Sequence, residues 1–300
     1  MVENPTILYI ISDKRSGSTL LENILSKSNE AVSLGEVAML KNHILKEGPG
    51  EKWGWNCSCG EALENCTFWS QVLQKILISS ASKEIETKIN WPYSSFYSLA
   101  FGIAPGIFKK KIFHKIQSGR SRQIAENVFD LYREVDVFTK KKFIVDSTKL
   151  PIQALALFKM KKGIPIKFIF LTRDIRGIAF SKKKSREKNE IKVSFKDLYK
   201  VWVYKKFATA ILKFIPKEDV ITIHYENLVE KTGEELGKIF SFTNMQSFET
   251  PRYMELSNDH TLGGTPKRFD KRAIKLDESW RKYFDQHGFK NLAGKIFNNT

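Results

Sequence analysis

Cysteine is scarce in this sequence, and the few cysteines lie close together. Cys57, Cys59 and Cys66 are the only ones among 300 residues. An odd number in one short segment makes no disulfide framework and is typical of a reducing compartment, so we predict a cytoplasmic location. A zinc site would need His43 or His114 as a fourth ligand, and no second pair of thiols supports one. The sequence therefore predicts no bound metal.

Long apolar runs are also missing. The least polar stretch, residues 96–108, is interrupted by Gly102, Pro105 and Gly106. It is shorter than the about 20 apolar residues that a membrane-spanning helix needs. Residues 1–5 lack the basic and apolar regions of a signal peptide. We therefore expect neither a transmembrane segment nor a secretion signal.

Acidic residues are few compared with basic ones. The chain has 33 Asp and Glu against 50 Lys and Arg, which gives a net charge of +17. Such an excess favours an anionic partner, for example a nucleotide, a polysaccharide, a nucleic acid or an acidic lipid. The charge alone selects none of them. Because no known nucleic-acid-binding module appears, we expect no nucleic-acid partner.

Short apolar runs alternate with amphipathic segments along most of the chain. The runs predict strands over residues 7–11, 31–34, 143–145, 166–171 and 220–223. The amphipathic segments predict helices over residues 19–28, 152–160, 175–188, 195–214 and 233–242. The strand runs are continuously apolar, which is typical of strands covered on both faces. We therefore predict a single α/β domain over residues 1–300, with three layers and a central parallel sheet flanked by helices.

One long segment interrupts this alternation. Residues of about 45–140 separate the second predicted strand from the third and are rich in aromatic residues and lysine. Insertions of this kind commonly carry the specificity of an enzyme for its acceptor. We expect this segment to form the acceptor side of the site.

The most informative segment follows the first predicted strand. There the chain reads Ser-Asp-Lys-Arg-Ser-Gly-Ser-Thr-Leu over residues 12–20, just before an amphipathic helix pattern. A Ser/Gly-rich turn at a helix N-terminus presents backbone N–H groups to a phosphate. The segment lacks the Gly-Lys-Ser/Thr sequence with which a Walker A motif ends. A kinase or NTPase and a non-catalytic polyanion-binding protein remain alternatives, the first because of the loop and the second because of the charge.

Polar residues also follow the other predicted strands. Ligands of open parallel sheets bind at the carboxyl ends of the strands, and these ends carry Arg15, Glu36, Ser147, Lys149, Arg173 and Tyr225. Ser181 follows Arg173 by eight residues, about two turns into the next predicted helix. One cation and one hydroxyl so placed could converge on a phosphate. The alternative is a capping arginine and a surface serine.

Four motifs in order resemble those of sulfotransferases that use 3′-phosphoadenosine 5′-phosphosulfate (PAPS). Residues 15–20 resemble the loop that binds the 5′-phosphosulfate. Residues 170–176, with Ser181, are similar to the motif for the 3′-phosphate. Residues 225–228 resemble the family's Tyr-Glu-Asp-Leu strand end, and residues 260–268 its C-terminal glycine loop. The chain thus looks like a bacterial-type member of the carbohydrate and tyrosylprotein group, with a P-loop-like fold.

The resemblance implies a reaction and a set of nucleotide contacts. A sulfuryl group would pass from PAPS to an acceptor hydroxyl, most often of a carbohydrate, without a metal. The residues that the resemblance places at the nucleotide are Arg15, Ser16, Gly17, Ser18, Thr19, Leu20, Arg173, Ser181, Tyr225, Gly264, Thr265, Lys267 and Arg268. The cations Arg176, Lys182, Lys183 and Lys184 would add a positive field, unless they only form a solvated helix face.

The same resemblance suggests three catalytic residues. Glu36 would be the general base that takes the proton of the acceptor hydroxyl. Arg15 would stabilise the charge on the departing phosphate, and Lys149 would lie near the transferred group. The alternatives are a Glu36 that caps a helix or pairs with lysine, a solvated Arg15 and a surface Lys149. His260 has no evident catalytic partner, and we expect it to cap its loop.

Overall fold

The computed structural model describes residues 4–47, 55–79, 85–90, 105–185, 191–254, 260–264 and 271–286. Its core is a five-stranded parallel sheet with the strand order β2-β3-β1-β4-β5. The strands are β1 (Thr6–Ser12), β2 (Ala31–Gly35), β3 (Phe143–Lys149), β4 (Ile166–Thr172) and β5 (Val220–His224). Each of the five predicted strands is present, so the predicted parallel sheet is confirmed.

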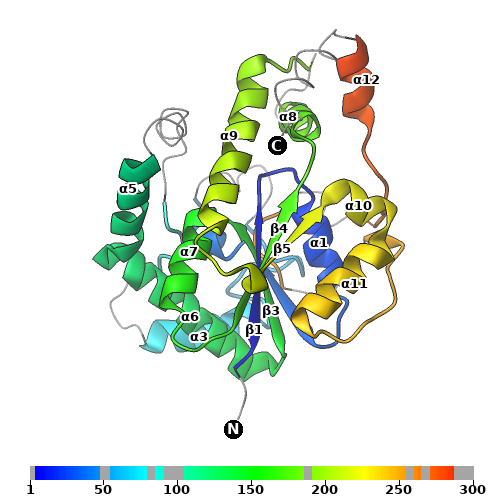
Figure 1. The fold of residues 1–300 in the computed structure, drawn as a ribbon. Coiled ribbons are helices and arrows are strands. Elements are labelled where there is room, and N and C mark those ends of the chain that lie inside the picture. Colours follow the sequence, from blue (N-terminus) through cyan, green and yellow to red (C-terminus); the bar gives the residue numbers. More distant parts are fainter. Residues whose placement is uncertain are drawn as a thin grey trace.

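Helices cover both faces of the sheet (Figure 1). One face packs against α1 (Ser18–Leu25), α10 (Tyr225–Glu230) and α11 (Thr232–Thr243). The other packs against α3 (Trp69–Ser79), α5 (Pro105–Gln117), α6 (Gly119–Thr139), α7 (Pro151–Met160) and α9 (Phe195–Leu212). The predicted three-layer architecture is therefore confirmed.

Burial explains why β1 occupies the centre of the sheet. Ile7, Tyr9 and Ile11 point into one apolar layer, Leu8 and Ile10 into the other, and all five are fully buried. The edge strand β5 differs, because it has a neighbour on one side only. Thr222 and His224 in β5 are exposed. The expectation that every strand is covered on both faces is thus wrong for β5.

The elements that the structure describes between β2 and β3 are helical. They comprise η1 (Val37–Met39), α2 (Leu40–Leu45), α3, α5 and α6. A further helix pair, α8 (Ile175–Lys184) and α12 (Ser279–Gln286), packs with α9 in a small separate apolar cluster. The described part of the chain also contains three short elements, η3 (Lys217–Asp219) and the antiparallel pair β6 (Tyr253–Met254) and β7 (Arg272–Ala273).

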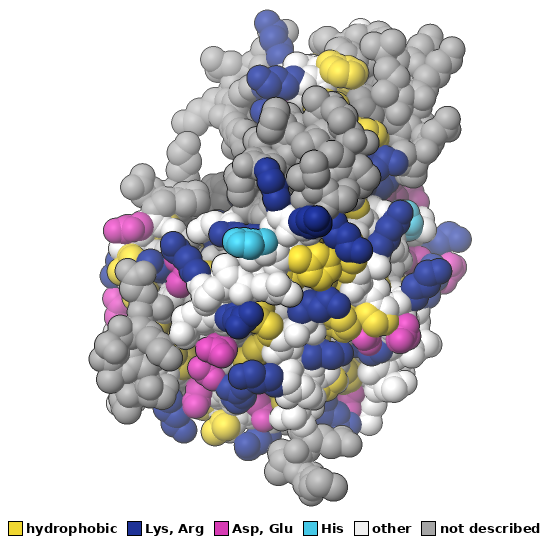
Figure 2. Space-filling model, turned by 60° about the vertical axis from the view of Figure 1, so that its left-hand side comes forward, with side chains coloured by type: hydrophobic (Ala, Val, Ile, Leu, Met, Phe, Trp, Pro, Cys, Tyr) yellow, Lys and Arg dark blue, Asp and Glu magenta, His cyan; other side chains and the backbone are white. Residues whose placement is uncertain are grey.

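The surface reflects the composition of the chain. On the face in Figure 2, Lys and Arg side chains are spread over the molecule with acidic side chains among them. No helix in the described part of the chain is both long enough and apolar enough to cross a membrane.

Candidate active site

The loop after β1 has a backbone that only a glycine at position 17 allows. Gly17 precedes α1 with a φ of 93°, and a Cβ there would lie 2.4 Å from Cδ2 of Tyr225. Arg15 also has a positive φ, 74°. The resulting turn leads directly into α1, whose first amides, from Ser18 and Thr19, have no acceptor within the helix. These N–H groups and the helix dipole make the loop suitable for an anion.

Leu20 stands apart from the other loop residues. Its N–H donates to the carbonyl of Gly17 at 2.9 Å, and its side chain is buried in the core. Leu20 therefore fixes the turn by packing and by a backbone bond.

Arg15, Arg173 and Ser181 meet beside this loop. Arg15 Nε donates to Ser181 Oγ at 3.0 Å, and Arg173 Nη1 donates to the carbonyl of Arg15 at 3.0 Å. The guanidinium of Arg173 also stacks on the ring of Tyr225, 4.4 Å from its centroid. Ser181 is buried and so is not the surface serine of the alternative, whereas Arg173, also buried, does donate to backbone carbonyls, to that of Arg15 and at 3.3 Å to that of Asp277. The structure thus joins the loop after β1 to the end of β4.

Among the residues that the structure describes, three buried polar atoms in this region have no hydrogen-bond partner. They are Ser12 Oγ, Ser16 Oγ and Arg173 Nε. Buried polar atoms in proteins are nearly always hydrogen-bonded, and each one left unpaired costs about 1–3 kcal/mol. Ser16 and Arg173 line a small pocket at the ends of β1 and β4, together with Asp13, Tyr204 and Lys205. An unpaired hydroxyl and an unpaired guanidinium N–H suit an anionic ligand.

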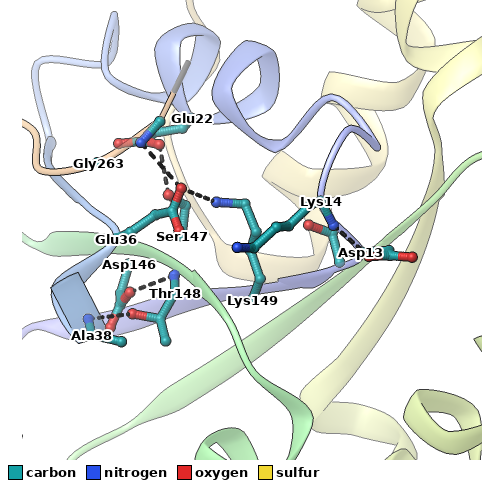
Figure 3. Close-up of polar contacts among 12 residues, drawn as sticks. Asp13, Lys14, Glu22, Glu36, Ala38, Asp146, Ser147, Thr148, Lys149 and Gly263 are labelled. Atoms are coloured by element: carbon teal, nitrogen blue, oxygen red, sulfur yellow. Dashed lines mark hydrogen bonds and ion pairs between the residues drawn. The ribbon is translucent and has the colours of Figure 1, made fainter. Parts of the chain in front are cut away.

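A second cluster lies at the ends of β2 and β3 (Figure 3). Lys149 Nζ contacts Glu36 Oε1 at 2.6 Å, and the same oxygen accepts a hydrogen bond from the Gly264 N–H at 3.1 Å. Lys14 extends toward this pair from the loop after β1. Burial alone would raise the pKa of Glu36, but Lys149, the Gly264 amide and Lys14 outweigh it and lower the pKa below its usual value. Glu36 is therefore an ionised carboxylate at neutral pH.

A backbone ladder aligns Glu36 with the C-terminal glycine loop. The Glu36 N–H donates to the carbonyl of Leu262 at 2.8 Å, and the Leu262 N–H donates to that of Leu34 at 2.9 Å. Gly35 is required here, because a Cβ would lie 2.1 Å from the Leu262 carbonyl oxygen. The Gly263 N–H donates to His43 Nε2 at 3.1 Å. Residues 262–264 thus extend the sheet edge beside Glu36.

The buried carboxyl group of Asp146 supports this arrangement through hydrogen bonds. Asp146 accepts hydrogen bonds from Tyr132 Oη at 2.6 Å and from the Thr148 N–H at 2.7 Å, and Thr148 Oγ1 accepts one from the Ala38 N–H at 3.0 Å. These bonds fix the turn after Glu36. Burial raises the pKa of Asp146 to about 6.

Glu22 on α1 is a second buried acidic residue that is held by hydrogen bonds. It accepts hydrogen bonds from Ser33 and Ser147 hydroxyls, each at 2.7 Å, and so ties α1 to β2 and β3. Burial raises the pKa of Glu22 to about 7. Three titratable carboxyl groups near this edge of the sheet thus differ in pKa, and Glu36 is the one whose pKa is lowered.

Tyr204 on α9 connects the two clusters. Its hydroxyl lies 2.7 Å from the carbonyl oxygen of Ser12 and 2.8 Å from that of Lys149. One side chain therefore fixes the ends of β1 and β3 relative to each other. This contact holds the loop after β1 at a set distance from Lys149 and Glu36.

Three of the four cations of α8 are paired with nearby carboxylates. Lys182 contacts Asp13 at 2.6 Å, Lys183 contacts Asp197 at 3.6 Å, and Arg176 contacts Asp174 at 2.6 Å. These ion pairs reduce the positive field that the sequence predicts for this helix.

The structure brings most of the predicted site residues to one edge of the sheet. One cluster consists of the residues of the loop after β1 together with Arg173, Ser181 and Tyr225. The other cluster consists of Glu36, Lys149 and Gly264. Thr265, Lys267 and Arg268 lie outside the described residues. Sequence reasoning missed Lys14 and Tyr204 as site residues. A lysine before the loop and a tyrosine inside a helix carry no pattern that sets them apart.

The chain belongs to the sulfotransferase family, whose family model matches residues 6–249. Several solved structures are similar, including two sulfotransferase domains and one sulfotransferase. A sulfotransferase domain from the Synechococcus PCC 7002 olefin synthase is 17% identical, with a TM-score of 0.49, covering 93% of this chain and 88% of that one. A sulfotransferase domain from the curacin biosynthetic pathway is 15% identical, with a TM-score of 0.48 and coverages of 95% and 98%.

The third structure is sulfotransferase STF1 from Mycobacterium tuberculosis H37Rv. It is 11% identical, with a TM-score of 0.44, covering 83% of this chain and 70% of that one. No curated protein matches the sequence.

Proposed function

We propose that this protein transfers a sulfuryl group from PAPS to an acceptor hydroxyl, with a carbohydrate as the preferred acceptor class and a reducing cytoplasm as its location. The observation that carries the proposal is the hydrogen bond from Arg15 to Ser181. It joins an anion-binding loop to a second cation and hydroxyl, beside an ionised carboxylate. A donor with phosphate groups at two ends needs such a double site.

The two halves of the first cluster suit the two ends of the donor. The open amides of Ser18 and Thr19, with Arg15, would hold the 5′-phosphosulfate. Arg173 and Ser181 would hold the 3′-phosphate. Ser181 Oγ accepts from Arg15, so its own O–H is available to donate to a phosphate oxygen. Each charge-assisted hydrogen bond of this kind contributes about 1.5–3 kcal/mol, enough to select a 3′-phosphorylated nucleotide.

The second cluster would perform the transfer. The acceptor oxygen attacks sulfur and forms a new S–O bond, its proton passes to Glu36, and the bond from sulfur to the bridging oxygen breaks. The electron pair of that bond leaves with adenosine 3′,5′-bisphosphate. Arg15 and Lys149 would stabilise the charge that develops on the bridging oxygen. The lowered pKa of Glu36 keeps its carboxylate ionised, so it carries no proton before the acceptor binds.

We assign the acceptor side to the helical elements between β2 and β3, within a single domain of residues 1–300. This segment leads from Glu36 into η1 and α2, so its first residues border the carboxylate that would act as base. An acceptor bound there would reach Glu36 directly.

Transfer from labelled donor tests the reaction. The full chain is incubated with PAPS labelled in the sulfuryl group and with panels of carbohydrate, tyrosyl-peptide and small-alcohol acceptors. We expect label in a carbohydrate product and one adenosine 3′,5′-bisphosphate released per transfer. Label found only in a peptide or small alcohol would correct the acceptor class. Absence of transfer to every class, with PAPS left intact, would contradict the proposal.

A further inference from the structure

The three cysteines meet His260 in space, although the sequence separates His260 widely from them. His260 Nδ1 lies 3.1 Å from Cys66 Sγ and 3.6 Å from Cys57 Sγ, and Cys59 Sγ lies 3.7 Å from Cys66 Sγ. The four ligand atoms all lie within 4.8 Å of one another. Cys66 and His260 are 194 positions apart in the chain. The fold therefore assembles three sulfur atoms and one imidazole nitrogen around a common centre.

These distances match the edges of a zinc tetrahedron. With Zn–S bonds of about 2.3 Å and Zn–N bonds of about 2.0–2.1 Å, tetrahedral angles place two sulfurs about 3.8 Å apart and a sulfur and a nitrogen about 3.6 Å apart. The separations of 3.7 Å and 3.6 Å agree closely, and that of 3.1 Å is somewhat shorter. A disulfide would require two sulfurs at about 2.05 Å. We propose that Cys57, Cys59, Cys66 and His260 bind a structural zinc ion.

The surroundings of His260 hold its ring in place. The ring stacks on Phe68 with the two planes 5° apart, and the His260 carbonyl accepts a hydrogen bond from Trp69 Nε1 at 2.7 Å. Thr261 and Ser58 join the two segments through two further bonds, from the Thr261 N–H to Ser58 Oγ and from the Ser58 N–H to the Thr261 carbonyl. Partners of this kind fix a ligand before the metal binds.

The fourth ligand differs from both histidines that the sequence suggests. His43 has both ring nitrogens engaged, with Nδ1 2.7 Å from the Trp55 carbonyl and Nε2 accepting from Gly263. His114 lies exposed on α5. His260 takes the fourth position instead, so its expected role as a loop cap is replaced. Three cysteines and one histidine form a closed set, as in structural zinc sites, with no position left for a reactant.

The site lies next to the residues proposed for catalysis. His260 is followed by Leu262, which pairs with β2, and by Gly264, whose N–H donates to Glu36. A zinc ion at the cysteines would therefore hold the start of the glycine loop against the body of the protein. Its role would be to position Glu36 through the backbone, and no step of the transfer would pass through it.

Metal analysis of the purified full chain tests this inference. The protein is prepared under reducing conditions without chelator, and its metals are measured by mass spectrometry. We expect about one zinc per chain. After exchange for Co²⁺, we expect the visible spectrum of a tetrahedral ion with thiolate-to-cobalt bands. A zinc-free, folded protein that gives no such spectrum with added Co²⁺ would overturn the proposal, as would a disulfide that persists under reducing conditions.

Two variants assign the ligands. Cys59→Ser removes the exposed cysteine, which lowers the risk of misfolding. Loss of a hydrogen-bond partner of a ligand weakens metal binding by about 10–100-fold, and loss of the ligand itself should weaken zinc binding by more than that. Ser58→Ala is the matched control: it removes the bond to Thr261 between the same two segments but keeps all four ligands. We expect it to retain the zinc. Equal zinc affinity in wild type and in both Cys59→Ser and His260→Gln would exclude this ligand set.

Discussion

Replacing Glu36 with glutamine is expected to lower kcat by about 10²–10⁴-fold, which is the usual contribution of a general base. Glutamine has the same shape and keeps an oxygen for the Gly264 N–H, but it cannot accept a proton from the acceptor. Because Glu36 lies apart from Arg173 and Ser181, the Kd for adenosine 3′,5′-bisphosphate should change little. Steady-state kinetics and calorimetric titration of the nucleotide measure the two effects separately.

A matched control is Glu235→Gln. Glu235 is a buried carboxylate on α11 that also pairs with a lysine, Lys238, but it lies outside the site. This variant should keep the kcat of the wild type. A Glu36→Gln enzyme with wild-type turnover would show that another group accepts the proton.

The pH profile distinguishes Glu36 from its acidic neighbours. A base must be deprotonated, so the rate falls as the pH drops through the pKa of that base. The pKa of Glu36 is lowered from 4.5, so the acid limb of kcat/KM should lie below pH 4.5. A limb near pH 6 or 7 would point to Asp146 or Glu22, whose pKa values are about 6 and about 7.

The second large effect is expected from Arg15→Lys. Loss of one preorganised donor raises the barrier by about 3–4 kcal/mol and lowers kcat by about 10²–10³-fold. Lysine keeps the charge but has no planar fork, so it cannot reach Ser181 and the donor at the same time. Both residues carry a Cβ, so the backbone cost of the positive φ at this position is shared and cancels in the comparison.

Arg133→Lys is the control for this substitution. Arg133 is an exposed arginine on α6 that pairs with Asp130, within the same helix. The free energy of unfolding should change by no more than about 1 kcal/mol, because exposed ion pairs contribute about 0–1 kcal/mol, and kcat should remain within about twofold of the wild type. An Arg15→Lys enzyme as active as Arg133→Lys would remove Arg15 from the proposed mechanism.

Much of the fold follows from the sequence because burial on both faces leaves a strong pattern. The apolar runs at residues 7–11 and 166–171 became β1 and β4, and their ends carry Arg15 and Arg173. Parallel strands place those ends at one edge, which is why residues 158 positions apart meet through a hydrogen bond. The burial of β5 was harder to predict, because its residues do not indicate whether it lies at the centre or at the edge of the sheet.

Contacts that depend on tertiary packing could not be predicted. Tyr204 lies in an apolar helix pattern, and only the structure places its hydroxyl between Ser12 and Lys149. His260 approaches Cys66 because residues 260–264 align with β2. No local sequence pattern predicts this pairing. Helix α1 likewise ends at Leu25 and not at residue 28, since helix ends depend on capping and packing.

Nucleotide selectivity tests the central claim most directly. Unfolding temperatures of the full chain are measured with adenosine 3′,5′-bisphosphate, ADP, ATP and a polyanion, with and without magnesium. At about 100 times its Kd a ligand stabilises the folded state by about 2.7 kcal/mol. We predict that adenosine 3′,5′-bisphosphate gives the largest shift, without magnesium, and that Arg173→Ala removes most of it. Stabilisation by ATP with magnesium alone, or only by a polyanion in a way that salt abolishes, would contradict the account.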